Sequence, residues 1–157
     1  MKTVVCGVLE LPQVNSNNQF THILSLQDPP ETMQEQARHA RLLAMLEKTG
    51  AEVTSLLFRD VRGRMNTSCA SPDEDDINAI CRFAEGLGEE DSALVHCTTG
   101  VSRSTAALAI VYMCRDEGLS EQDACEKVRR QREISRPNER MLWLYGRRSV
   151  MVDGRVL

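Results

Sequence analysis

The segment that most constrains the fold is a helix-forming stretch that is apolar on nearly every side. Residues 101–117 are predicted to form a helix, and the side chains from Ala106 to Met113 are almost all apolar. A helix without a polar face belongs in the interior of a domain, because it offers no surface to water. The apolar stretch 92–96 just before it is predicted to be a strand, so a buried strand passes directly into a buried helix.

Strand-like and helical segments alternate along the rest of the chain. Strands are expected over 3–9, 21–26, 51–58 and 92–96, and helices over 31–48, about 71–87, 101–117, 120–133 and from Pro137 onward. The helix near residue 71 is predicted to have Ser71 as its N-cap, Pro72 in the first position and Glu74 completing a capping box. The alternation predicts an α/β fold with three layers: a short, mainly parallel sheet of four or five strands, with helices on both faces.

Length, charge and cysteine usage narrow the class of protein. The 157 residues are expected to form one domain over 1–157, and the net charge of -4 disfavours a general nucleic-acid binder. Six cysteines occur without a Cys-x-x-Cys pair or a zinc-like Cys/His spacing, which predicts reduced thiols and no metal site. No segment has the length or pattern of a membrane span or a signal peptide, so a cytoplasmic protein is expected.

The stretch HCTTGVSRST, residues 96–105, carries the chemistry. It lies between the predicted strand and the buried helix, where backbone N–H groups lack helical partners and can converge on an anion. Gly100 permits a close approach or an unusual backbone angle, and the planar guanidinium of Arg103 can hold two oxygens of a phosphate. The same positive field favours the thiolate form of Cys97, which would then be a nucleophile beneath a bound phosphoryl group.

This stretch resembles the signature of the cysteine-dependent protein tyrosine phosphatases, in which His-Cys is followed by five residues, Arg, and Ser or Thr. The short chain is similar to the compact dual-specificity branch and to bacterial tyrosine-phosphatase-like proteins. The resemblance extends from about residue 20 to residue 146, with support from LLFRDV and RPN. It implies a dual-specificity phosphatase-like fold, a single phosphatase domain, and hydrolysis of phosphomonoesters without a cofactor or metal.

The resemblance also implies a role for each matching residue. Cys97 would form a phosphocysteine, Arg103 would bind phosphate and stabilise the transition state, and Ser104 would donate a hydrogen bond to the sulfur of Cys97. His96 would support the loop from behind, and Asn138 would support it from the start of the last helix. The phosphate-binding loop would comprise Cys97, Thr98, Thr99, Gly100, Val101, Ser102 and Arg103.

The leaving group needs a general acid, which in this family is an aspartate on a loop before the cysteine. Asp60 fits, because it directly follows the apolar segment SLLF and Arg59. Asp73, Asp75 and Asp76 remain alternatives, although acidic residues at a helix start are explained by the helix dipole alone.

Three further readings concern residues around this loop. Cys69 is a candidate redox partner that could form a reversible disulfide with Cys97. Arg59, Arg62 and Arg64 could form a basic rim beside Asp60, or belong to a solvated loop. Arg129, Arg130, Arg132 and Arg136 are interpreted as a solvated helix face.

The predicted function is that of a protein tyrosine or dual-specificity phosphatase acting on a phosphorylated protein, with phosphotyrosine as the main target and phosphoserine or phosphothreonine as others. The enzyme is expected to be a monomer, with no nucleic-acid or membrane partner. Two alternatives remain open. The same loop serves phosphatases of RNA 5′-phosphates, nucleotides, sugars and phosphoinositides, and a misplaced acid would leave a weakly active phospho-binding module. A sulfurtransferase of the rhodanese type is disfavoured, because its loop lacks the Cys-x5-Arg-Ser pattern.

Overall fold

The computed structural model describes residues 1–63 and 70–152 of the chain. Its strands are Lys2–Gly7 (β1), His22–Gln27 (β2), Glu52–Leu57 (β3) and Ser92–Cys97 (β4). They form one sheet in the order β1-β4-β2-β3, and every neighbouring pair is parallel. The predicted short parallel sheet is confirmed, with the strand that precedes the phosphatase-like motif in an interior position.

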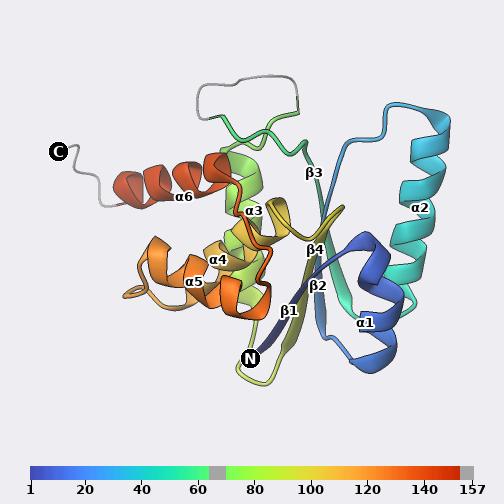
Figure 1. Ribbon diagram of the computed structural model, residues 1–157, viewed down its shortest axis with the longest axis horizontal. Helices are drawn as coiled ribbons and strands as arrows, with labels where there is room; N and C mark the ends of the chain where they lie inside the picture. Colours follow the sequence, from blue (N-terminus) through green and yellow to red (C-terminus); the bar gives the residue numbers. More distant parts are fainter. Residues whose placement is uncertain (64–69, 153–157) are drawn as a thin grey trace.

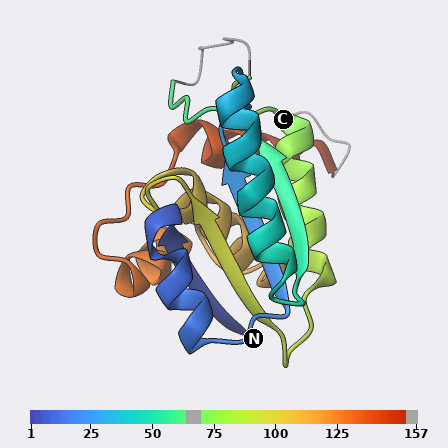
Figure 2. The ribbon, with the colours of Figure 1, turned by 90° about the vertical axis from the view of Figure 1, so that its right-hand side faces the viewer.

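Helices cover both faces of this sheet, which confirms the three-layer prediction. They are the short 3-10 helix Val8–Glu10 (η1) and the α-helices Leu11–Asn17 (α1), Met33–Glu47 (α2), Glu74–Gly86 (α3), Arg103–Arg115 (α4), Glu121–Gln131 (α5) and Glu139–Val152 (α6). Helices α1 and α2 lie on one side of the sheet, and α3 to α6 lie on the other (Figure 1). In a view of the molecule rotated by 90°, α1 and α2 lie in front of the strands (Figure 2).

Helix α4 is the central helix of the larger layer, as its apolar sequence predicts. Every residue from Arg103 to Met113 is buried, and α4 packs against α3, α5 and α6 as well as against β4. Successive side chains of β4 point to opposite faces of the sheet. Val95 belongs to the hydrophobic cluster beneath α4, and Leu94 belongs to the cluster beneath α1 and α2. The sheet is therefore apolar on both faces, as parallel sheets are.

Two local predictions are wrong. Helix α3 begins two residues later than expected, because Asp73 and not Ser71 is the N-cap. The carboxylate of Asp73 accepts from the N–H of Asp76, and the carboxylate of Asp76 accepts from the N–H of Asp73. This reciprocal pair forms a capping box and satisfies two N–H groups at the start of α3. The strand expected over 3–9 also ends early, at Gly7, and residues 8–17 form η1 and α1. Pro12 falls in the first turn of α1, where proline is tolerated.

The carboxyl ends of the four strands lie along one edge of the sheet. There the chain leaves β1 at Gly7, β2 at Gln27, β3 at Leu57 and β4 at Cys97. Loops that are far apart in sequence thus meet around Cys97, at the position where open α/β sheets usually bind ligands. Among the helices described, none is long and apolar enough to cross a membrane.

Candidate active site

Residues 97–103, here called the cradle loop, connect β4 to α4 and pack tightly against the end of β1. Gly100 has a φ of +71°, and a Cβ atom added there would lie 2.5 Å from the carbonyl carbon of Cys6. A Cβ atom on Gly7 would in turn lie 2.8 Å from the carbonyl carbon of Thr99. Both glycines are therefore required for the two backbones to approach, which gives the predicted role of Gly100 a specific partner.

The thiol of Cys97 lies on the floor of this loop. Its Sγ atom is 3.1 Å from the Oγ atom of Ser104, and the N–H of Gly100 donates to it at 3.3 Å. Burial alone would raise the pKa of Cys97. Hydrogen bonds from Ser104 and Gly100, together with the charge of Arg103, outweigh that effect and lower the pKa below its ordinary value of 9.0. The thiolate is thus favoured, as the position between strand and helix indicates.

The guanidinium of Arg103 is buried beside the thiol and held at its edges. Nη1 donates to the carbonyl of Phe58 at 2.6 Å and to the carboxylate of Asp28 at 3.1 Å, and Nη2 donates to the hydroxyl of Thr98 at 3.1 Å. The Nε atom is buried and has no hydrogen-bond partner among the residues described. A bound oxyanion would satisfy this donor, since buried N–H groups are rarely left unpaired.

Asp60 reaches the cradle loop from the segment that follows β3. Its Oδ1 atom accepts hydrogen bonds from the hydroxyl of Ser102 at 2.6 Å and from Nδ2 of Asn138 at 2.7 Å. Asn138 also donates through Nδ2 to the carbonyl of Val61 and through its backbone N–H to the carbonyl of Ser102. Asn138 therefore ties together the Asp60 segment, the cradle loop and the start of α6.

The alternative carboxylates have other partners. Asp73 and Asp76 form the capping box of α3. Burial raises the pKa of Asp76 to about 6, and the nearby carboxylates of Asp73 and Asp75 add to that increase. Asp75 is exposed in the first turn of α3, where it complements the helix dipole. Of the four candidate aspartates, Asp60 is the one that accepts a hydrogen bond from a side chain of the cradle loop, the hydroxyl of Ser102.

His96 lies behind the loop in the middle of the sheet. It is fully buried, and it stands in register with Cys6 of β1 and Ser25 of β2. Burial lowers the pKa of His96 to about 4, so the imidazole is neutral near pH 7. A neutral ring packed between strands suits the predicted supporting role and not that of a base.

Arg132 was interpreted from the sequence as part of a solvated helix face, and that interpretation is wrong. Its Nε donates to the carbonyl of Gly100 at 2.8 Å, and its Nη2 donates to the carbonyl of Thr99 at 3.3 Å. It also forms a two-pronged ion pair with Glu10, both contacts at 2.8 Å, and its side chain is only 15% exposed. Glu10 accepts from the N–H of Gly7 as well, so Arg132 joins the cradle loop to the end of β1.

Two of the three arginines of the predicted basic rim have polar partners, and the third, Arg64, lies outside the described residues. Arg59 pairs with Glu31, just before α2. Arg62 donates to the carbonyl of Arg136 at 2.6 Å and, at 3.4 Å, to the hydroxyl of Ser102. Arg62 thus contacts the cradle loop directly, whereas Arg59 faces the neighbouring pocket.

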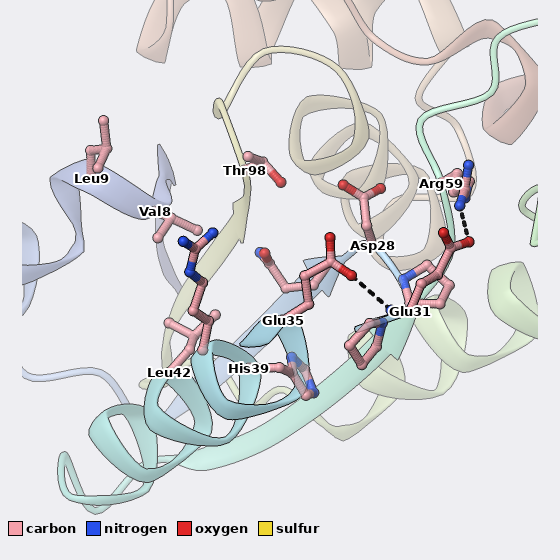
Figure 3. A pocket seen from close by; sticks show the side chains of 13 residues that line it. Val8, Leu9, Asp28, Glu31, Glu35, His39, Leu42, Arg59 and Thr98 are labelled. Carbon is pink, nitrogen blue, oxygen red and sulfur yellow. Dashed lines mark hydrogen bonds and ion pairs between the residues drawn. The ribbon is translucent and has the colours of Figure 1, made fainter. Parts of the chain in front are cut away.

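A pocket of about 710 Å³ opens beside the cradle loop. Asp28 and Thr98, which both contact Arg103, line it on the cradle side (Figure 3). Its charged lining is mixed: Asp28, Glu31 and Glu35 supply carboxylates, and Arg38, His39 and Arg59 supply basic groups. Sequence reasoning missed Asp28 and this pocket, because no local pattern shows that the loop after β2 meets a helix that begins 75 residues later.

Two further expectations concern a redox partner for Cys97 and the absence of a metal site. Cys69, the predicted redox partner of Cys97, lies outside the described residues. Within residues 1–63 and 70–152, no group of three or more His, Cys, Asp and Glu side chains is arranged to hold a metal ion.

Comparison with known proteins places this geometry in context. A family model described as "Dual specificity phosphatase, catalytic domain" matches residues 6–148. The structure of Tk-PTP in the active form is similar at 21% identity and a TM-score of 0.63, covering 99% of this chain and 94% of that chain. Human DUSP28 is similar at 15% identity and a TM-score of 0.65, covering 98% of this chain and 95% of that chain.

A third similar structure is a complex with PI(5)P. PTPMT1 in complex with PI(5)P matches at 15% identity and a TM-score of 0.63, covering 98% of this chain and 95% of that chain. At these identities the likeness of the solved structures shows the fold alone. No match was found among curated proteins.

Proposed function

This chain belongs to the family of dual specificity phosphatase catalytic domains, and from that membership we propose that it hydrolyses phosphomonoesters of protein side chains through a phosphocysteine at Cys97. The observation that supports this proposal is that the cradle loop places the thiol of Cys97 beside the guanidinium of Arg103. A cysteine whose pKa is lowered lies next to a buried arginine, Arg103, with a free Nε donor. A nucleophile and an oxyanion site are thus supplied by the same turn.

In the first step, the thiolate of Cys97 attacks phosphorus and the bond from phosphorus to the leaving oxygen breaks. Arg103 and the backbone N–H groups of the cradle loop hold the equatorial oxygens. Asp60 gives its proton to the leaving oxygen, so an alcohol or phenol departs in place of an alkoxide or phenoxide. The contact of Asp60 with Ser102 supports this role, because it keeps the carboxyl at the rim of the loop.

In the second step, water attacks the phosphocysteine and the bond from sulfur to phosphorus breaks. Asp60, now a carboxylate, accepts a proton from that water. Ser104 donates to the departing sulfur, a role that its distance of 3.1 Å from Sγ supports. Inorganic phosphate leaves, and the thiolate is regenerated.

The adjoining pocket bears on the substrate. Three carboxylates line it, and one of them, Asp28, lies against Arg103. Asp28 would repel an additional phosphate next to the cradle loop, and the remaining lining, with basic groups as well as carboxylates, suits a substrate that carries neutral groups or charges of both signs. A peptide segment beside a phosphorylated tyrosine meets this requirement. The complex of the similar PTPMT1 with PI(5)P makes a phosphoinositide the second candidate, and the experiment below separates the two.

The test compares hydrolysis of phosphotyrosine, phosphoserine and phosphothreonine peptides, nucleotides and phosphoinositides by wild-type protein, Asp60→Asn and the matched control Asp75→Asn. We expect Asp60→Asn to lower kcat on peptides by about 10²–10⁴-fold and to affect p-nitrophenyl phosphate far less, because its leaving group needs less protonation. Asp75→Asn should behave as wild type.

Three results would each overturn a different part of the proposal: the general acid, the protein substrate or the catalytic activity. Unchanged turnover of phosphopeptides by Asp60→Asn would reject Asp60 as the acid. Phosphoinositides as the best substrates would replace the protein substrate with a lipid. Tight binding of phosphopeptides without turnover would indicate a phospho-binding module.

A further inference from the structure

Two cysteines outside the active site lie in direct contact. The Sγ atoms of Cys81, in α3, and Cys114, near the end of α4, are 3.2 Å apart. Neither is disulfide-bonded in the structure. The helices that carry them pack against each other, and Arg115 fastens their ends by donating to the carbonyls of Ala84 and Leu87. The two sulfurs are therefore held together by the fold, independently of the proposed catalytic groups.

The two thiols differ in exposure and in acidity. Cys81 is fully buried, whereas Cys114 is partly exposed. The hydrogen bond with Cys81 lowers the pKa of Cys114 below 9.0 against the effect of burial, and Tyr145 and Arg148 of α6 contribute in the same direction. The pKa of Cys81 is raised by the same hydrogen bond and by burial. Cys114 is thus the thiol with the lower pKa and the greater exposure, and Cys81 is the one whose protonated form is favoured.

We propose that Cys81 and Cys114 form a dithiol that hydroperoxides convert into a disulfide linking α3 to α4. The thiolate of Cys114 attacks one oxygen of the hydroperoxide, the O–O bond breaks, and a sulfenic acid forms while the other oxygen leaves as water or an alcohol. The sulfur of Cys81 then attacks the sulfur of Cys114, the S–O bond breaks, and the hydroxyl leaves as water with the proton of Cys81. Two thiols lose two electrons to the hydroperoxide, so the step is balanced.

The proposed Cys81–Cys114 disulfide would lie away from the cradle loop. A disulfide needs the sulfurs to approach from 3.2 Å to about 2.05 Å, and the proposal requires side-chain rotation and a small helix movement to supply that shift. Cys114 lies 11 residues after Arg103 (114 − 103), so the link would form about 16 Å along α4 from the proposed catalytic arginine. The disulfide therefore fastens two helices without entering the cradle loop, which distinguishes it from a bond that would block Cys97.

The experiment maps disulfides in the full chain. Reduced wild-type protein is treated with hydrogen peroxide, its remaining thiols are alkylated, and it is digested without reductant for mass spectrometry. We expect a cross-linked pair of peptides containing Cys81 and Cys114, in equal yield in Cys97→Ser. A melting temperature about 5 °C higher than that of the reduced protein should accompany the link. Alkylated Cys81 and Cys114 after complete oxidation of Cys97 would overturn the proposal.

Single variants test the order of the steps. In Cys81→Ser, Cys114 should accumulate sulfenic acid that dimedone traps, whereas in Cys114→Ser the buried Cys81 should remain unlabelled. Cys125→Ser, which removes another partly buried cysteine, should leave the cross-link intact. Equal dimedone labelling of Cys81 and Cys114 would contradict the assignment of Cys114 as the reacting thiol. All of these readouts are independent of phosphatase activity, so they do not depend on the proposed function.

Discussion

The Nη1 atom of Arg103 lies 3.1 Å from the Oδ1 atom of Asp28, so the arginine proposed to bind phosphate already has a carboxylate beside it. The side chain of Arg103 is 4% exposed and that of Asp28 is 58% exposed. Without a bound anion, Asp28 compensates a charge that would otherwise be buried alone. When phosphate is bound, the same carboxylate repels it.

We expect Asp28→Asn to strengthen phosphate binding. The amide keeps an oxygen that can accept from Arg103 but removes the negative charge, which should lower the inhibition constant of inorganic phosphate by about two- to tenfold. Competitive inhibition of p-nitrophenyl phosphate hydrolysis measures it. Glu90→Gln, an exposed charge change at the opposite edge of the sheet, is the control. Weaker binding of phosphate by Asp28→Asn would show that Asp28 acts mainly by positioning Arg103.

The hydrogen bond from Ser104 should set part of the acidity of Cys97. The bond favours the thiolate, so Ser104→Ala should raise the pKa of Cys97 by about one unit, the equivalent of one charge-assisted hydrogen bond. The pH dependence of iodoacetamide alkylation, with Cys97 followed by mass spectrometry, gives the pKa. In wild-type protein the midpoint should lie below 9.0. An unchanged or lower midpoint in Ser104→Ala would contradict the role of this hydroxyl.

Arg132 offers a test of how the cradle loop is held. Arg132→Gln removes the ion pair with Glu10 and weakens the contacts to the carbonyls of Gly100 and Thr99. We expect kcat/KM to fall by about tenfold or more, since charge-assisted hydrogen bonds to the loop are lost. Arg129→Gln on the exposed face of α5 loses only a surface pair with Glu126 and should change kcat/KM by less than about twofold. Equal effects of the two variants would mean that Arg132 does not position the loop.

The layers of the fold could be predicted because they follow from local patterns. The apolar run of α4 and the alternation of short strands with helices indicate a three-layer α/β domain without any knowledge of contacts. Helix α5 lies within the predicted range 120–133, with Ser120 as its N-cap accepting from the N–H of Asp123. Helix α1 was missed because it has only seven residues and follows a strand through a 3-10 turn, which leaves no helical periodicity to detect.

The site was predictable where its residues are adjacent in sequence. Cys97, Gly100, Arg103 and Ser104 lie in one turn, so their spacing carries their geometry. The partners of that turn come from elsewhere and have no local signal. Asp28 reaches Arg103 from the end of β2, and Arg132 reaches Gly100 from the end of α5. An arginine after an amphipathic helix looks solvated in the sequence, and only the tertiary fold shows that it holds the loop.

The phosphocysteine is the central claim, and acid quenching during turnover tests it most directly. Wild-type protein is mixed with p-nitrophenyl phosphate, quenched in acid within the first turnovers, digested and analysed by mass spectrometry. The account predicts one phosphoryl group on the peptide that contains Cys97, and none on that peptide in Cys97→Ser, whose turnover is lost. A phosphoryl group on another residue, or normal turnover by Cys97→Ser, would contradict it.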